Sequence, residues 1–194
     1  CVDSIRRALT DEEEYNRFLA VVFPHDQLEI LPYNRVVRDL NGMSADSFLT
    51  ELGRLYEIEE AASGKPPKAG MFCMFLKGRW FLLSPGFSPQ GDVVARLDVS
   101  VLQNTVLGPI LGIQDPRKDA RIDFVGGLRG PGELERLVRD GEFAVAFSLH
   151  PTAIGELIDV ADKGGLMPPK STWFEPKLRS GLVIHEIERP AGRR

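Results

Sequence analysis

Short apolar runs separated by turn residues recur along most of the chain. Runs of this kind are typical of buried or half-buried strands, whose side chains pack on the faces of a sheet. The predicted strands cover residues 18–23, 28–31 continued by 35–39, 71–76, 79–83, 121–125, 142–149, 172–174 and 182–187. Only Lys77-Gly78 separates 71–76 from 79–83, so these two strands are predicted to form a β-hairpin.

Helical periodicity fills the gaps between several of these strands. Ser44 precedes one such pattern, and serine is a residue type that caps helix N-termini. Asp98 would cap a second helix, while Pro131 and Pro151 open two more. Strands and helices that alternate in this way predict an α/β to α+β fold, with helices packed against a mixed β-sheet.

The length of 194 residues suits one large domain or two small ones that share a core. We expect a single domain over residues 1–194. Residues 62–70 (ASGKPPKAG) are rich in glycine, proline and lysine, which favours an exposed turn. An internal hinge is therefore predicted at 62–70.

Composition and charge narrow the classes of function. The chain is 43% hydrophobic and 27% charged, as is ordinary for a globular protein. Its formal net charge is −4, whereas modules that bind nucleic acid usually have a basic surplus, so we do not expect nucleic acid as a ligand. No apolar run reaches the roughly 18 residues that span a bilayer. The two cysteines, Cys1 and Cys73, form no disulfide framework, so a cytoplasmic protein without a membrane segment is expected.

The candidate functional site is the stretch at residues 167–177 (MPPKSTWFEPK). With the preceding glycines its spacing resembles a phosphate-binding P-loop, but Pro169 replaces the second glycine. A P-loop binds phosphate through successive backbone N–H groups and proline has none, so we reject that assignment. Two cations and two hydroxyls remain in this stiff loop and could bind phosphate or carboxylate: Lys170, Ser171, Thr172 and Lys177. The alternative is a loop whose aromatic residues pack in the core and whose lysines face solvent.

Two other patterns were candidates for chemistry. Arg35 and Arg38 could clamp an oxyanion, with Asp39 as a metal ligand or base; the alternative is an edge strand whose charges face solvent. Ser148 and His150 share a face of one predicted strand but lack a nucleophile elbow, so we expect a structural role for them. No histidine or cysteine has a second ligand at metal spacing, and no metal site is predicted.

Four stretches resemble a known family. They are FLAVVFPHDQLEILPYNRVVRDLNG (18–42), LDVSVLQNTVLGPILGI (97–113), FAVAFSLHPT (143–152) and MPPKSTWFEPKLRSGLVIH (167–185). Together they resemble the C-terminal half of domain-of-unknown-function family 1015, whose members are considerably longer. The first half of those members has an Asp-Gly-His-His-Arg motif that links them distantly to a ParB-like and sulfiredoxin-like nucleotide-binding superfamily, which includes free-serine kinases. This chain lacks the motif and starts at Cys1, so the resemblance implies the C-terminal part of a longer protein.

The resemblance implies a nucleotide-dependent small-molecule kinase with a serine-like substrate, which would use ATP with Mg²⁺ when full length. It assigns no catalytic residue. It favours the following residues as phosphate or substrate ligands in a cleft: Lys170, Ser171, Thr172, Lys177 and Arg35. Two alternatives stay open, a non-enzymatic ParB-like nucleotide-binding or regulatory module, and a structural half that supplies core and a homodimer surface. The expected partners are a small-molecule or nucleotide ligand and the missing N-terminal half, without which this chain would be inactive.

Overall fold

A computed structural model describes residues 18–185 of the chain. The chain divides into two compact units, one formed by Glu29–Glu175 and the other by the segments on either side of it. The unit Glu29–Glu175 contains all the strands and α-helices that the structure describes. No helix in the described part of the chain is both long and apolar enough to cross a membrane.

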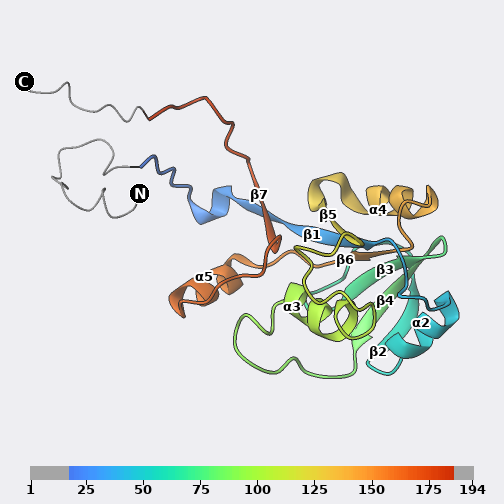
Figure 1. Ribbon diagram of the computed structural model, residues 1–194. Coiled ribbons are helices and arrows are strands. Elements are labelled where there is room, and N and C mark those ends of the chain that lie inside the picture. Colours follow the sequence, from blue (N-terminus) through green and yellow to red (C-terminus); the bar gives the residue numbers. More distant parts are fainter. Residues whose placement is uncertain (1–17, 186–194) are drawn as a thin grey trace, which may run out of the picture. The chain divides into compact units, whose positions relative to one another are not determined.

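The strands of the unit Glu29–Glu175 form one seven-stranded sheet (Figure 1). They are β1 (Glu29–Val37), β2 (Tyr56–Ala61), β3 (Phe72–Leu76), β4 (Arg79–Pro85), β5 (Ile122–Gly126), β6 (Val145–Ser148) and β7 (Thr172–Glu175). Their order is β2-β4-β3-β6-β1-β5, and β7 pairs with the first half of β1 outside this path. Each of these pairings is antiparallel.

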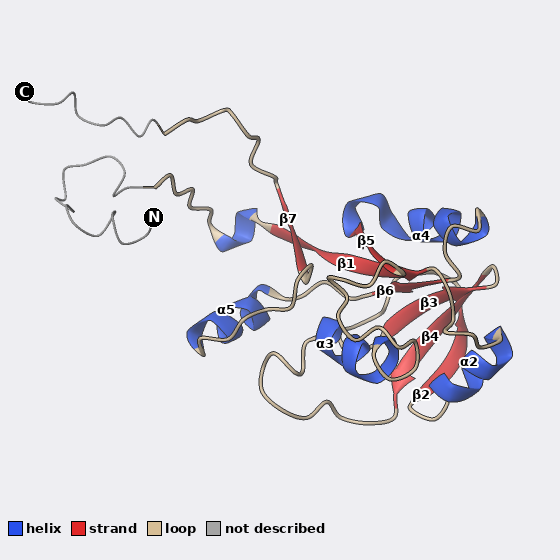
Figure 2. Ribbon diagram, in the orientation of Figure 1, coloured by secondary structure: helices blue, strands red, loops and turns tan. Residues whose placement is uncertain are grey.

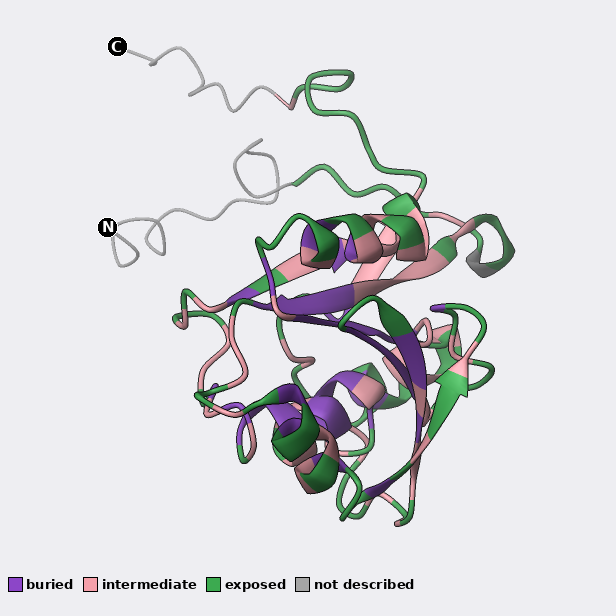
Figure 3. Cartoon of the chain, turned by 90° about the vertical axis from the view of Figure 1, so that its right-hand side faces the viewer, coloured by how far each residue is buried: buried purple, intermediate pink, exposed green. Residues whose placement is uncertain are grey.

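Four α-helices pack against this sheet (Figure 2). They are α2 (Ala45–Leu52), α3 (Asp98–Leu102), α4 (Gly130–Arg139) and α5 (Ile154–Asp162). Residues of α2 and α3 pack in one apolar cluster with Val37 and Phe147 of the sheet. Residues of α4 pack in a second cluster with Val36 and Ala146. Because neighbouring strand residues point to opposite faces, α4 covers the face opposite to α2 and α3, and the buried strands lie between these layers (Figure 3).

The predicted fold class and the hairpin are confirmed. β3 and β4 pair across Lys77-Gly78, whose φ angles of 46° and 79° are both positive, as a two-residue type I′ turn requires. The sheet that the sequence predicts as mixed has antiparallel neighbours throughout the pairings described. The unit β5–α4–β6 explains this difference: its two strands do run in the same direction, but β1 lies between them and is antiparallel to both.

Two predicted strands are wrong. Residues 18–23 (FLAVVF) have no regular secondary structure, and Phe18 and Val22 are 84% and 91% exposed. Residues 182–185 form turn and coil with exposed apolar side chains, while 186–187 lie outside the described residues. An apolar run marks residues that can pack, but a strand also needs a neighbour for its backbone hydrogen bonds. Neither segment pairs with a strand in the part of the chain that the structure describes.

The predicted hinge at residues 62–70 is the loop between β2 and β3, inside the unit Glu29–Glu175. The backbone N–H of Gly70 donates a hydrogen bond to Oδ1 of Asp98 at 2.8 Å. The sequence predicts Asp98 as the N-cap of α3, but Leu97 has that position and Asp98 is the first residue of the helix. The Asp98 carboxylate therefore accepts a hydrogen bond from the loop instead of capping the helix. Hinge motion of the loop stays a prediction.

Candidate functional site

Arg35 lies on the part of β1 that has β5 on one side and β6 on the other. Its register partners are Phe124 in β5 and Phe147 in β6, and the residue is only 4% exposed. The guanidinium donates from Nη1 to the carbonyl of Tyr33 at 2.7 Å and from Nη2 to the carbonyl of Lys170 at 3.0 Å. It also lies over the Phe124 ring, 4.7 Å from the centroid. β1 thus holds a cation inside the fold with a fixed orientation.

The guanidinium of Arg35 has no carboxylate partner among residues 18–185, since both of its acceptors are neutral carbonyls. Burial lowers the pKa of Arg35 to about 9, and the charge of Tyr33 opposes this shift only in part. The side chain is still a cation at neutral pH. A buried charge without a counter-ion is unfavourable, and the N–H groups of Arg35 that donate to neither carbonyl are available to an anion.

A cavity of about 170 Å³ opens onto Arg35, and we call it the arginine cavity. It is lined by Arg35, Val99, Ser100, Gln103, Asn104, Pro116, Pro168 and Pro169. The Gln103 amide donates one of its two N–H groups to the carbonyl of Ile113 at 2.7 Å, and Ser100 and Asn104 are further neutral donors of the lining. The lining contains no acidic residue. A cation and neutral donors without a carboxylate suit an oxyanion.

The loop between α5 and β7 covers this cavity with Pro168 and Pro169. Ser171 is 5% exposed and its hydroxyl donates to the carbonyl of Pro168 at 2.6 Å, which closes a tight turn. Lys170 lies inside this turn at a positive φ of 56°, an uncommon conformation for a residue with a side chain. The Lys170 carbonyl is therefore directed to Arg35 by the hydrogen bonds of the loop.

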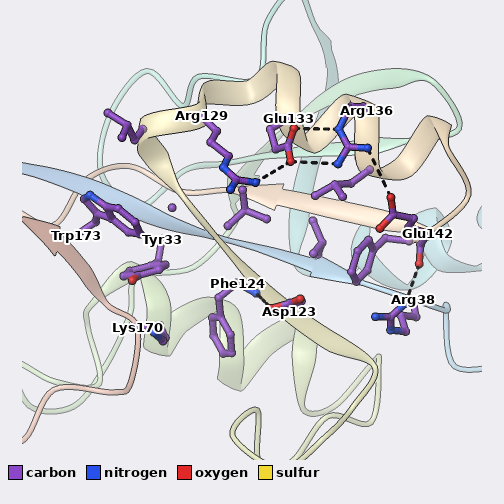
Figure 4. Close-up of a pocket in the computed structure, with 16 residues that line it drawn as sticks. Tyr33, Arg38, Asp123, Phe124, Arg129, Glu133, Arg136, Glu142, Lys170 and Trp173 are labelled. Carbon is purple, nitrogen blue, oxygen red and sulfur yellow. Dashed lines mark hydrogen bonds and ion pairs between the residues drawn. The ribbon is translucent and has the colours of Figure 1, made fainter.

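The side chain of Lys170 lines a different and larger cavity of about 620 Å³, which we call the edge cavity (Figure 4). It lies along β5 between the start of β7 and α4. Nζ of Lys170 is 5.2 Å from the centroid of the Tyr33 ring, and that ring is 5.3 Å from the ring of Trp173. The edge cavity is lined by Tyr33, Val36, Arg38, Asp123, Phe124, Val125, Gly126, Leu128, Arg129, Glu133, Arg136, Leu137, Glu142, Phe143, Lys170 and Trp173.

Two arginines of the edge cavity, Arg129 just before α4 and Arg136 within it, are paired with carboxylates. Arg129 lies 3.1 Å from Glu133, and Arg136 lies 3.0 Å from Glu133 and 3.5 Å from Glu142 (Figure 4). The hydrogen bond from Arg136 keeps the pKa of Glu133 below its usual range. These cations are already neutralised and exposed to solvent, so an anion would gain less from them than from Arg35.

The structure brings two of the predicted site residues together, Arg35 and Lys170. Ser171 contributes a hydrogen bond inside the loop, and Thr172 is half-buried in β7 opposite Pro32. Lys177 is exposed and belongs to the other compact unit.

The predicted clamp of Arg35 and Arg38 is wrong. Arg35 is buried on β1, whereas Arg38 lies just beyond the end of that strand and is exposed, donating to the carbonyls of Ala120 and Glu142. Asp39 pairs with Arg121 at 3.3 Å. The alternative of an edge strand is also wrong, because β1 has a neighbour on both sides at Arg35.

Sequence reasoning missed Ser100 and Asn104. Both lie in or just beyond α3, where the periodicity predicts only a helix packed on the core, and nothing in the sequence marks them as facing Arg35. Within residues 18–185 no group of three or more His, Cys, Asp and Glu residues could hold a metal ion. The described residues therefore offer no such set of ligands for the Mg²⁺ that the family resemblance implies.

Comparison with solved structures finds several matching chains. A mutant of free serine kinase in complex with AMP is 14% identical, with 77% of this chain and 54% of that chain covered and a TM-score of 0.45. The mutant of free serine kinase in complex with ADP is also 14% identical, with 77% of this chain and 54% of that chain covered and a TM-score of 0.43. A conserved hypothetical protein from Pyrococcus furiosus is 14% identical, with 77% of this chain and 56% of that chain covered and a TM-score of 0.46. The chain thus spans about half the length of these structures.

No curated protein matches the sequence of this chain. A family profile does match it, over residues 2–100, which include Arg35 and end before Lys170. The matched segment is just over half of the chain. The chain therefore belongs to the family described as Protein of unknown function (DUF1015).

Proposed function

We propose that the arginine cavity and the Lys170 loop bind the phosphate of a nucleotide, or of the product formed from it. The whole protein would be a nucleotide-dependent kinase that phosphorylates a small, serine-like hydroxylated metabolite. The observation that carries the proposal is Arg35, a buried cation that has no carboxylate partner among residues 18–185 and that opens onto a cavity.

The energetics of Arg35 support an anionic ligand. Both hydrogen bonds to backbone carbonyls orient the guanidinium without neutralising it. An oxyanion in the arginine cavity would supply the missing negative charge beside the buried guanidinium, and charge-assisted hydrogen bonds are stronger than neutral ones. Ser100 and Asn104 would add neutral donors. The ligand would therefore be held mainly by Arg35.

Lys170 would act as a second, mobile cation. Its side chain is exposed and lies over the Tyr33 ring, while its own carbonyl accepts a hydrogen bond from Arg35. A lysine is a point charge on a flexible stem, so its ammonium can leave the ring for a phosphate oxygen. Phosphoryl transfer depends on such positioning and charge neutralisation. The substrate class comes from the family resemblance, and the groups that complete the transfer would belong to the rest of the protein.

The test is to incubate the full-length protein with ATP and a panel of amino and hydroxy acids, and to measure ADP and phosphorylated product. Arg35→Met is expected to lower kcat/KM by about 100-fold or more, because it removes a fixed charge at the phosphate. Lys170→Ala should have a smaller effect. Lys163→Ala, which removes an exposed lysine beside α5, is the matched control and should behave as wild type.

The outcomes distinguish the proposed kinase from a non-enzymatic nucleotide-binding module. Absence of turnover together with unchanged ATP binding in Arg35→Met and Lys170→Ala would contradict the proposal. ATP binding that Arg35→Met abolishes, without turnover of any acid, would instead indicate a non-enzymatic nucleotide-binding or regulatory module.

A further inference from the structure

A third cavity lies on the other face of β1, and none of its lining residues is shared with the arginine cavity. Its volume is about 470 Å³, and because Asn34 lines it, we call it the Asn34 cavity. Asn34 and Arg35 are neighbours on a strand, so their side chains point to opposite sides of the sheet. The cavity lies where β5 runs through the glycine-rich segment 126–132 (GGLRGPG) into α4.

Two buried polar side chains open onto this cavity. Asn34 is 2% exposed, and its Oδ1 accepts a hydrogen bond from the backbone N–H of Leu149 at 3.1 Å. This bond fixes the amide so that its Nδ2 is left as a donor, for which the described residues offer no acceptor. Ser148 is 4% exposed, and its hydroxyl has no hydrogen-bond partner among the described residues either. Neither donor atom is fully buried, so both reach the cavity and are available to a ligand there.

The charges around the Asn34 cavity favour an anion. Lys65 of the β2–β3 loop lines it, as does His150, and the lining contains no acidic residue. The start of α4 adds the positive end of a helix dipole. The α4 backbone itself supplies few contacts, since the N–H of Gly130 is bonded to the carbonyl of Gly127 and Pro131 has none. Side chains would therefore make the direct contacts.

The remaining walls are apolar, and they include Leu31, Leu128 and Leu149. A bare oxyanion would leave most of this cavity unfilled and these walls in contact with water. We propose that the Asn34 cavity binds a small organic oxyanion, whose phosphate or carboxylate head is held by Asn34, Ser148 and Lys65 and whose apolar body packs on the leucines. This site is separate from the phosphate site proposed at Arg35.

The proposal is tested by titrating ¹⁵N-labelled chain with four probes and following the side-chain amide of Asn34 and the backbone amide of Leu149. Phenyl phosphate and benzoate carry both parts of the expected ligand, with different heads. Inorganic phosphate has only the head, and phenol only the body. We expect saturable shifts at Asn34 and Leu149 with at least one of the first two, and an affinity about tenfold lower or worse for phosphate and phenol. The stronger of phenyl phosphate and benzoate identifies the head.

Variants then assign the contacts. Asn34→Asp exchanges the unpaired donor for a negative oxygen, while one oxygen can still accept from Leu149, so binding should fall by about tenfold or more. Ser148→Ala and Lys65→Ala should each weaken binding. Unlike Asn34→Asp, neither variant introduces a charge at a buried position, so both should leave the fold intact. Lys68→Ala removes an exposed lysine of the same loop that does not line the cavity, and should bind as wild type.

Two results would overturn the proposal. One is that no probe shifts Asn34 and Leu149, or that shifts appear only at residues of the arginine cavity such as Ser100. The other is that Ser148→Ala and Lys65→Ala bind as tightly as Lys68→Ala. Because the readout is at Asn34, failure here is distinguishable from failure of the site at Arg35.

Discussion

Nη2 of Arg35 donates a hydrogen bond to the backbone carbonyl of Lys170, 3.0 Å away and 135 residues further along the chain. This contact joins β1 to the loop that the sequence singles out as a candidate binding element. It leaves the charge of Arg35 unneutralised, and it keeps Lys170 next to the cation. The predictions that follow depend on this arrangement.

The first prediction concerns pH. Because burial lowers the pKa of Arg35 to about 9, the cation is present below that pH and lost above it. Sulfate keeps its charge across this range, so its affinity should be constant from pH 7 to 8 and fall about tenfold by pH 10 to 10.5. Isothermal titration of sulfate at several pH values measures this. The same fall should persist in Lys170→Met, whereas an affinity that stays flat to pH 10.5 would show that Arg35 is not the ligand.

The second prediction tests whether Ser171 shapes the loop or contacts the anion directly. The Ser171 hydroxyl is used for the hydrogen bond to the Pro168 carbonyl, so Ser171→Ala should loosen the turn without removing a ligand. We expect a loss of about 1 kcal/mol in the free energy of unfolding and a small loss of sulfate affinity. Ser88→Ala, an exposed serine in another proline-containing loop, should change neither. A loss of affinity as large as that of Arg35→Met would instead assign Ser171 a direct contact.

The third prediction tests the packing of β7 beside the site. A Cβ on Gly126 would lie 2.5 Å from Cε3 of Trp173, closer than any real contact. Gly126→Ala must therefore displace the ring, at a cost of about 1–3 kcal/mol in unfolding free energy. Gly132→Ala is the matched control, because its Cβ would meet nothing within 4 Å and alanine favours a helix. Urea unfolding of the two variants should differ clearly, and equal stabilities would contradict this placement of Trp173.

The fourth prediction concerns Asp98. Burial raises the pKa of its carboxyl to about 6, and the nearby Glu156 adds to this, while the hydrogen bond from Gly70 and the charge of His150 oppose it. Its Oδ2 is buried without a hydrogen bond. The folded chain thus holds this proton more tightly than the unfolded chain, so Asp98 lowers stability as pH rises from about 4 to 6.

Asp98→Asn should remove this dependence. At pH 7.5 the variant is expected to gain up to about 3 kcal/mol relative to wild type, because the amide carries no charge and can still accept from Gly70. At pH 4 the two proteins should be nearly equal. Urea unfolding at both pH values tests this, and a difference that does not change with pH would contradict it.

Much of the sheet could be predicted from local pattern. The hairpin was predictable because Lys77-Gly78 tolerates the positive φ angles of a tight turn, and α2 because Ser44 accepts a hydrogen bond from the backbone N–H of Ser47. Strand order could not be predicted, since it depends on which distant strands pair. The placement of β1 between β5 and β6 is such a long-range choice, and it makes the sheet antiparallel. Residues 18–23 form no strand although their apolar run predicts one, because they have no strand neighbour among the described residues.

The candidate site could also be predicted only in part, because local pattern indicates residue types but not which distant residues meet. The cationic composition of the loop and the arginine on β1 indicate an anion site, which stays a prediction, and the hydrogen bond between Arg35 and Lys170 shows that these two residues are neighbours. The sequence could not indicate that Arg35 is buried while Arg38 is exposed, because this depends on the face that each side chain occupies. Nor could it place Asn34 and Ser148 in one cavity, since they lie on different strands.

The central claim is that Arg35 is the principal ligand of an anion, and one matched pair of variants tests it most directly. Arg35 and Arg38 each donate to two backbone carbonyls and each lie 4.7 Å from a phenylalanine ring centroid, but only Arg35 is buried in a cavity without a carboxylate. Isothermal titration of sulfate into Arg35→Met and Arg38→Met at pH 7.5 should show an affinity at least about tenfold weaker for the first and unchanged for the second. Equal affinities in the two variants, at wild-type or at reduced strength, would contradict the claim.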